Sequence, residues 1–171
     1  GFELFRLFSG HPEWFPQSWL KRQMTTRLYL HGLRQARHLF AVSEDTKRFI
    51  ERIAKISSQK ITVTYEGLKI FPHTSLRRRE SGEVFALILG TVEPRKNIPF
   101  ITTLWPEIER RLGQSIQLVI AGQDGWGNVP IPSDASIKRL KTIDDEMRDQ
   151  LIRSASVVLV TSLHEGFGRV A

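Results

Sequence analysis

Two adjacent cations, Arg95 and Lys96, lie in the sequence GTVEPRKN, between the end of a predicted strand at Gly90 and the start of a predicted helix. An arginine guanidinium grips two oxygens in a fork and a lysine ammonium adds a compact charge, so the pair suits a diphosphate. The N–H groups at a helix start favour the same kind of ligand. The alternative interpretation is a solvated turn, whose charges only cap the helix and solubilise the surface.

A carboxylate beside two glycines forms the second candidate site, in the sequence HEGFG that follows the last predicted strand. Glu165 can accept hydrogen bonds from sugar hydroxyls. Gly166 and Gly168, on either side of Phe167, let the backbone approach a ligand closely. The alternative interpretation is that Glu165 caps the start of a helix.

No other group of residues in the sequence predicts a nucleotide-binding, metal-binding or catalytic site. The run GQDGWG lacks the glycine spacing of a dinucleotide-binding loop, so we interpret it as a turn with Trp126 packed against its domain. No group of His, Asp and Glu has the spacing of metal ligands, and nothing indicates a serine triad. The chain has no cysteine, which excludes disulfide scaffolds, thiolate metal sites and cysteine nucleophiles.

Short apolar runs alternate with helix-like segments in the second half, a pattern typical of a parallel sheet covered by helices. We expect strands at residues 84–89, 116–121, 137–140 and 157–160, the last of them buried, and helices at residues 98–112 and 145–154. The first helix is expected to bury one apolar stripe, made of Ile98, Ile101, Leu104, Ile108 and Leu112. Asn97 and Asp144 are the predicted helix caps. Ligands of open α/β folds bind at the carboxyl edge of the sheet, where HEGFG is expected to lie.

The sequence of the first half of the chain predicts fewer helices and strands. We expect helices at residues 17–37 and 44–55, the second capped by Ser43, and strands at residues 38–42 and 61–65. Residues 72–82 are polar and basic, as in a linker. The predicted organisation is therefore a first domain at residues 1–70, a linker at 71–82 and a second domain at 83–171. Each domain is expected to be α/β, with a parallel sheet and flanking helices.

The net charge of +7 belongs to the first half, because residues 1–82 carry 15 basic and 7 acidic side chains. These basic residues are scattered rather than interleaved with aromatic side chains on one surface, so we do not expect a nucleic-acid partner. No apolar run approaches the roughly 20 residues that span a bilayer. Contact with an anionic membrane, if made, is expected to be peripheral.

Four segments together carry a family resemblance. In chain order they are HLFAVSEDTKRFI, GTVEPRKN, IQLVIAGQDGW and IDDEMRDQLIRSASVVLVTSLHEGFG. From about residue 25 onward the chain resembles retaining glycosyltransferases of the GT-B fold, family 4. In that family two Rossmann-like domains hold an activated sugar nucleotide, mainly through the second domain. The resemblance implies that the chain contains parts of both domains, both incomplete. We therefore expect the chain to be an excerpt of a longer protein and to be inactive on its own.

The resemblance also implies roles for the candidate residues. Arg95 and Lys96 would bind the donor diphosphate together with Gly90, and no metal or other cofactor would be needed. Glu165 would be the catalytic carboxylate, and the segment Gly166–Gly168 would engage the transferred sugar and phosphate. Glu165 is also the first carboxylate of the family's Glu-x7-Glu pattern, whose second member would fall two residues beyond the last residue of the chain.

The leading hypothesis is therefore part of a cytoplasmic hexosyltransferase. It would transfer a sugar from a nucleoside diphosphate to a glycan or lipid-linked acceptor with retention, in surface polysaccharide or lipopolysaccharide biosynthesis, at the inner face of the plasma membrane. The alternative is a non-catalytic nucleotide-binding or regulatory α/β module. Flanking sequence distinguishes the two hypotheses, since an enzyme is expected to have an upstream glycine-rich loop and a second Glu two residues after Ala171.

Overall fold

The computed structural model describes residues 7–8, 10–11, 14, 18–67 and 84–168. They divide into two compact units: one holds the described residues up to Gly67 together with Glu165–Gly168, and the other holds residues 84–164. The predicted linker lies outside the described residues. Each unit is α/β, with a parallel sheet flanked by helices, as the sequence predicts. This arrangement is consistent with a Rossmann-like fold.

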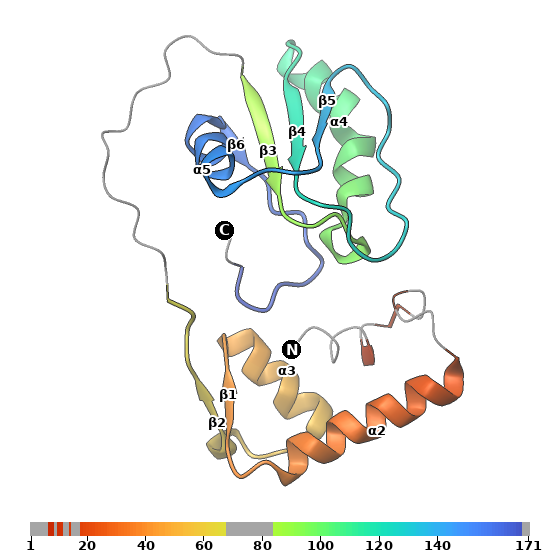
Figure 1. Ribbon diagram of the computed structural model, residues 1–171, viewed down its shortest axis with the longest axis vertical. Coiled ribbons are helices and arrows are strands. Elements are labelled where there is room, and N and C mark those ends of the chain that lie inside the picture. Colours follow the sequence, from red (N-terminus) through yellow and green to blue (C-terminus); the bar gives the residue numbers. More distant parts are fainter. Residues whose placement is uncertain (1–6, 9, 12–13, 15–17, 68–83, 169–171) are drawn as a thin grey trace. The chain divides into compact units, whose positions relative to one another are not determined.

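The first unit is built on one strand–helix–strand crossover (Figure 1). Strand β1 (Leu39–Ala41) pairs in parallel with β2 (Ile61–Val63), and helix α3 (Glu44–Ala54) with the short helix η2 (Ser58–Lys60) connects them. The Ser43 side chain caps α3 as predicted, since its Oγ accepts the Thr46 N–H at 3.1 Å. The core is small and consists of Ala41, Ile50 and Ile61, joined by the half-buried Leu33, Leu39 and Ile56.

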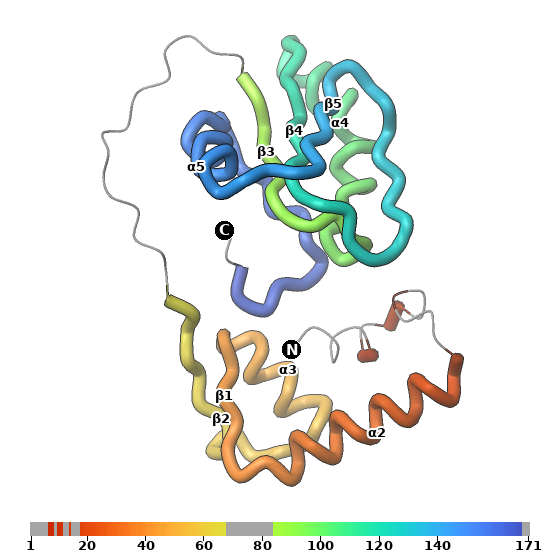
Figure 2. Tube along the Cα trace, in the orientation of Figure 1, coloured from red at the N-terminus to blue at the C-terminus, as the bar shows by residue number. Residues whose placement is uncertain are grey.

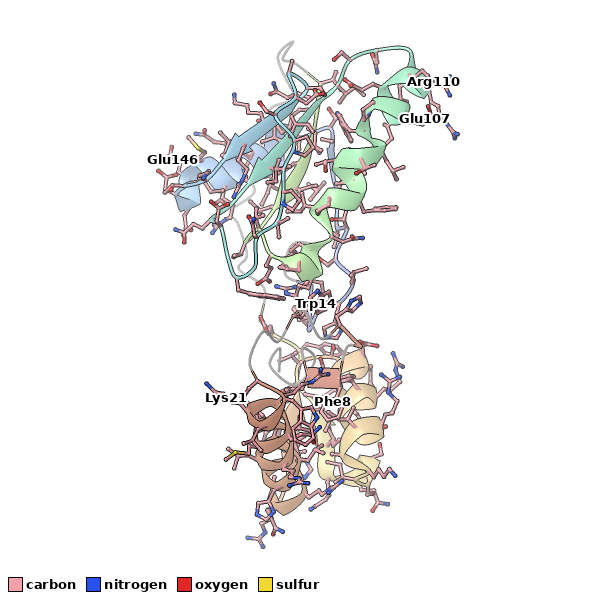
Figure 3. All side chains as sticks on the ribbon, turned by 90° about the vertical axis from the view of Figure 1, so that its right-hand side faces the viewer. Phe8, Trp14, Lys21, Glu107, Arg110 and Glu146 are labelled. Carbon is pink, nitrogen blue, oxygen red and sulfur yellow. The ribbon has the colours of Figure 1, made fainter. Side chains whose placement is uncertain are left out.

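Helix α2 (Trp19–Gln35) precedes that crossover and buries none of its residues. Leu20, Met24 and Leu28 are 61%, 64% and 73% exposed, and they are spaced four residues apart along the helix. The helix contains no acidic residue. Its surface is therefore both apolar and basic, and Lys21 projects from it in Figure 3.

The second unit contains a four-stranded parallel sheet in the order β5-β4-β3-β6. The strands are β3 (Phe85–Leu89), β4 (Gln117–Ala121), β5 (Ile137–Leu140) and β6 (Val157–Val158). Helix α4 (Ile98–Leu112) follows β3 after the short helix η3 (Pro94–Lys96), and α5 (Asp145–Ser154) precedes β6. Figure 2 traces the long loop between β4 and β5. These bounds lie within two residues of the predicted ones, the largest difference being the earlier end of β6.

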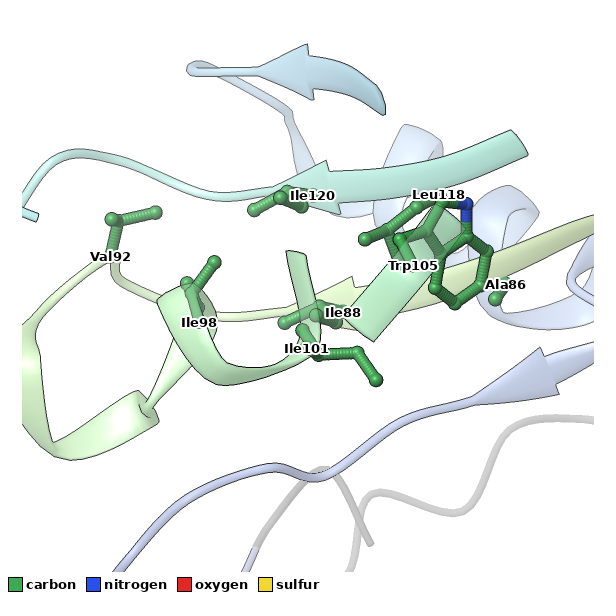
Figure 4. Close-up of a cluster of buried hydrophobic side chains, with 8 residues drawn as sticks. All are labelled: Ala86, Ile88, Val92, Ile98, Ile101, Trp105, Leu118 and Ile120. Atoms are coloured by element: carbon green, nitrogen blue, oxygen red, sulfur yellow. The ribbon is translucent and has the colours of Figure 1, made fainter. Parts of the chain in front are cut away.

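Two apolar layers cover the two faces of this sheet. Between one face of the sheet and α4 lies the cluster of Figure 4, to which β3, β4, the loop after β3 and α4 all contribute: Ala86, Ile88, Val92, Ile98, Ile101, Trp105, Leu118 and Ile120. On the opposite face Leu87, Val119 and Ala121 pack with α5 through Leu151 and Ala155. The alternation of inward residues along β3 and β4 thus places helices on both sides of the sheet.

Two predicted features of the second unit are wrong. Leu104 and Leu112 are 39% and 54% exposed, and Trp105, at 3%, belongs to the buried stripe of α4. The indole is held there because Trp105 Nε1 donates a hydrogen bond to Ile116 O at 2.9 Å, just before β4. The last strand was predicted as buried, but Val157 is 47% and Val160 46% exposed, since β6 is an edge strand of the described sheet and pairs only with β3.

The order of the strands creates a switch point between β3 and β6. The chain proceeds from β3 to β4 and β5 on one side, then returns to add β6 on the other side of β3. Open α/β sheets commonly bind ligands beside the carboxyl ends of the two strands at such a point. The loops at this point are residues 90–97 and 159–164.

Candidate functional site

The loop after β3 is fixed by a continuation of the sheet ladder. Gly90 N donates to Ala121 O at 2.9 Å, and Val92 N donates to Gln123 O at 2.8 Å. Gly125 N in turn donates to Val92 O at 2.9 Å, and Val92 is 3% exposed. The first residues of the loop are therefore held by the same kind of backbone hydrogen bonds as the strands β3 and β4.

Three glycines of the neighbouring loop allow this close approach. A Cβ at Gly122, whose φ is +140°, would overlap the carbonyl group of Gly90. At Gly125 it would lie 2.6 Å from Thr91 Cγ2, and at Gly127 2.8 Å from Pro94 Cγ. The sequence predicts only a turn at GQDGWG, so this supporting role was not predicted. The available signal was three glycines within six residues directly after a strand.

The turn η3 carries Arg95 and Lys96 and is bound to the loop after β6. Thr161 Oγ1 donates to Lys96 O at 2.6 Å, and Leu163 N donates to Arg95 O at 2.8 Å. Asn97 stands at the start of α4 as predicted, but its φ of +53° is left-handed and its side chain makes no capping hydrogen bond. The prediction that Asn97 caps α4 is wrong in this respect, because the helix follows η3 through a left-handed residue.

Arg95 connects the two loops of the switch point. Its Nε lies 2.5 Å from Glu93 Oε1, and its Nη1 donates to His164 O at 3.2 Å. The Arg95 side chain is 18% exposed and the Glu93 side chain 9%. The guanidinium is thus partly accessible, in a fixed place between the ends of β3 and β6.

Lys96 folds back over the end of β3. Its Nζ lies 3.5 Å from the position that a Cβ of Gly90 would occupy. Gly90 has a φ of +132° and no side chain, so the ammonium can approach the strand end. The structure therefore brings Gly90, Arg95 and Lys96 together in the second unit, at the place where a diphosphate is predicted to bind.

The other predicted residues, Glu165 and Gly166–Gly168, group with the first unit. There the carbonyl oxygen of Gly166 accepts hydrogen bonds from Ser43 Oγ at 2.6 Å and from Thr46 Oγ1 at 3.1 Å. The Phe167 ring lies 6.3 Å from the Tyr65 ring. These contacts hold the backbone of the segment, and the roles of its residues toward a sugar stay predictions.

A separate charged cluster lies at the ends of β4 and β5. Asp124 accepts from Arg139 at 3.0 Å and pairs with Lys141 at 3.1 Å. Hydrogen bonds, first from Arg139 and then from Lys141, lower the pKa of the Asp124 carboxyl. Arg139 also donates to Ile120 O and Leu140 O, so it ties both strands to the loop. A cavity of about 530 Å³ beside the cluster is lined by Val92, Asn128 and Ser133 among others.

Two searches of the described residues give negative results. Among residues 18–67, 84–168 and the few described before them, no group of three or more His, Asp and Glu side chains could hold a metal ion. Within the same residues, no helix combines the length and apolar character needed to cross a bilayer.

Comparison with protein-family models gives no match to the chain, and comparison with curated proteins gives none either.

Proposed function

We propose that this protein binds the diphosphate of a nucleoside-diphosphate sugar at the switch point between β3 and β6, as the donor-binding part of a retaining glycosyltransferase of the GT-B type. The observation that carries the proposal is the presence of two cations at this point: the Arg95 guanidinium bonds to the loop after β6, and the Lys96 ammonium lies beside Gly90 at the end of β3. Two cations beside the carboxyl ends of parallel strands fit a diphosphate in both charge and location.

The chemistry of sugar transfer needs such a site. Cleavage of the bond between the sugar and the diphosphate builds negative charge on the leaving phosphate and positive charge on the sugar. Cations held in advance stabilise the leaving group without reorganisation, and losing one such donor typically costs about 3 kcal/mol. We propose that Arg95 and Lys96 supply this stabilisation.

The remaining parts of the proposal follow the family resemblance. Glu165 is the proposed catalytic carboxylate, and the backbone of Gly166, Phe167 and Gly168 is proposed to engage the sugar and its phosphate. The proposed acceptor is a glycan or a lipid-linked sugar of surface polysaccharide or lipopolysaccharide. Such an enzyme works in the cytoplasm, in peripheral contact with the inner face of an anionic plasma membrane.

Calorimetry on the full chain tests the donor site. We expect inorganic pyrophosphate, and at least one of the UDP-, GDP- and ADP-sugars, to bind the parent. The double variant Arg95→Gln, Lys96→Met is expected to bind at least tenfold more weakly, because both cations are removed. The matched control is Arg110→Gln, Arg111→Met, which removes two exposed cations of α4 in the same unit. Equal affinity in the parent and the double variant, both folded, would contradict the proposal.

A further inference from the structure

Glu93 is a buried carboxylate that the proposed reaction does not use. It is 7% exposed, and among the residues that the structure describes it is the one ionisable residue that counts as buried. Burying a carboxylate is costly unless a partner compensates the charge, so its retention in a surface loop calls for a reason.

The partner of Glu93 is Arg95. Glu93 Oε1 lies 2.5 Å from Arg95 Nε, and the two residues are separated in sequence by Pro94 alone. The backbone between them is fixed, because Lys96 N donates to Glu93 O at 2.9 Å and Pro94 begins the η3 turn. Both side chains therefore leave a rigid turn, and their pairing restricts the long arginine chain.

The neighbouring loop makes room for the Glu93 side chain. The position of a Cβ at Gly125 lies 3.4 Å from Glu93 Cβ, and that glycine is held by its hydrogen bond to Val92 O. The same glycine loop thus supports the β3 loop and shields the stem of the carboxylate.

Arg95 has a second restraint on its other side. Its Nη1 donates to His164 O, so the guanidinium is held at two edges, one by each loop of the switch point. An arginine side chain carries about 2 kcal/mol of rotamer entropy, which a ligand must otherwise overcome when it orders the chain. A guanidinium ordered in advance removes this cost from binding.

We infer that Glu93 is a positioning residue: its buried carboxylate holds the Arg95 guanidinium against the loop after β6, in the orientation that receives the diphosphate. This inference rests on the proposed function and deepens it, because it names the group that orients the phosphate-binding arginine. Glu93 itself touches no phosphate, since like charges repel.

The electrostatic sign makes the inference testable. A carboxylate close to an anion site weakens anion binding through repulsion, so its removal alone would strengthen binding. A positioning role has the opposite effect, because an unrestrained Arg95 binds the anion more weakly. The direction of the change in pyrophosphate affinity on removal of the Glu93 carboxylate therefore distinguishes repulsion from a positioning role.

The experiment measures pyrophosphate affinity of the full chain by calorimetry, together with thermal stability. Glu93→Met, which removes the carboxylate that pairs with Arg95, is expected to weaken binding at least fivefold. Glu93→Gln keeps a side-chain oxygen at the same distance from the backbone but carries no charge. It is expected to weaken pyrophosphate binding less than Glu93→Met does. In an Arg95→Met background Glu93→Met should cause no weakening, since there is no guanidinium left to position. Glu107→Met removes an exposed carboxylate that pairs with Arg110 and Arg111 on α4, and serves as control (Figure 3).

Each outcome bears on one proposal or on both. Unchanged or tighter binding by folded Glu93→Met would overturn the positioning role and leave the donor site intact, whereas a parent that binds neither pyrophosphate nor any nucleotide sugar would overturn both. If Glu93→Met does not fold, Glu93→Gln decides, together with the NMR signal of the Arg95 Nε–H. That signal is expected to shift in Glu93→Gln, and an unchanged signal with unchanged affinity would overturn the inference.

Discussion

At the scale of single residues, the proposed donor site depends on glycines that carry no chemistry themselves. Gly122 has a φ of +140°, and its backbone lies directly against the carbonyl group of Gly90. Any side chain at this position must displace Gly90, the first residue of the loop after β3. We expect Gly122→Ala to lower the free energy of unfolding by about 3 kcal/mol or more, because strain and overlap add. Urea unfolding followed by circular dichroism measures this.

Gly32 provides the matched control for that substitution. It lies in α2, and a Cβ there meets no atom within 4 Å. Alanine in a helix is favoured over glycine, so Gly32→Ala should stabilise the chain by about 0.5 kcal/mol. Similar effects of the two substitutions would contradict the close approach of the two loops.

Lys96 is the residue through which the donor site is expected to respond to salt. Its ammonium lies over the end of β3, beside Gly90. Lys96→Met should weaken pyrophosphate binding about tenfold at low salt, and the loss should shrink as salt screens the charge. Titrations at two salt concentrations check this, with Arg111→Met as an exposed-cation control. A loss independent of salt would indicate that Lys96 acts through packing rather than charge.

At the scale of secondary-structure elements, one hydroxyl is among the groups that hold the loop after β6 to η3. Thr161 Oγ1 donates to Lys96 O at 2.6 Å and so ties this loop to η3. Thr161→Val keeps the shape and removes the bond, and we expect a loss of about 1 kcal/mol in stability together with weaker pyrophosphate binding. Thr103→Val, on the exposed side of α4, should change neither quantity. Weaker binding by both variants would show that the effect is not specific to this bond.

The loop between β4 and β5 predicts a pH dependence. Arg139 and Lys141 lower the pKa of Asp124, so this carboxyl stabilises the fold once it is ionised, above its unfolded pKa of about 4. The contribution is present at neutral pH and is lost as the pH falls from about 4 through the lower folded pKa. The stability difference between the parent and Asp124→Asn, measured by urea unfolding, should therefore shrink between pH 7 and pH 3. A difference that stays constant would contradict the pairing.

The elements that the sequence predicted well are those with local signals. Asp144 caps α5 through its hydrogen bond to Met147 N at 2.8 Å, and the apolar runs of β3 and β4 are buried as expected. The errors involve partners distant in the chain. Trp105 is buried because its indole reaches Ile116, and β6 is exposed because of its place in the strand order. Neither fact follows from spacing within one element.

The candidate site shows the same division. Strand, turn and helix signals placed Arg95 and Lys96 at a ligand edge, and the structure brings both to the switch point with Gly90. Glu93 stood in the same motif and was overlooked, because its sequence context gave no sign of burial. Burial came from the glycines of another loop, whose contacts depend on the pairing of β3 with β4.

At the scale of the whole molecule, charge and exposed apolar residues predict contact with anionic lipid. Helix α2 carries Lys21, Arg22, Arg27 and Arg34 and no acidic residue, beside the exposed Leu20, Met24 and Leu28. We expect the full chain to sediment with anionic vesicles and to be released by salt. Lys21→Glu, Arg27→Glu should reduce sedimentation, whereas Arg110→Glu, Arg111→Glu on α4 should not. Equal sedimentation with neutral and anionic vesicles would contradict this prediction.

The ladder that continues beyond β3 and β4 has a consequence for kinetics. Val92 donates its N–H to Gln123 O and accepts the N–H of Gly125 before any ligand arrives, so the loop after β3 has no folding step to complete. Association should then proceed in a single phase whose rate rises linearly with ligand concentration. Variants that alter affinity, Glu93→Met included, should differ from the parent mainly in how fast the ligand leaves.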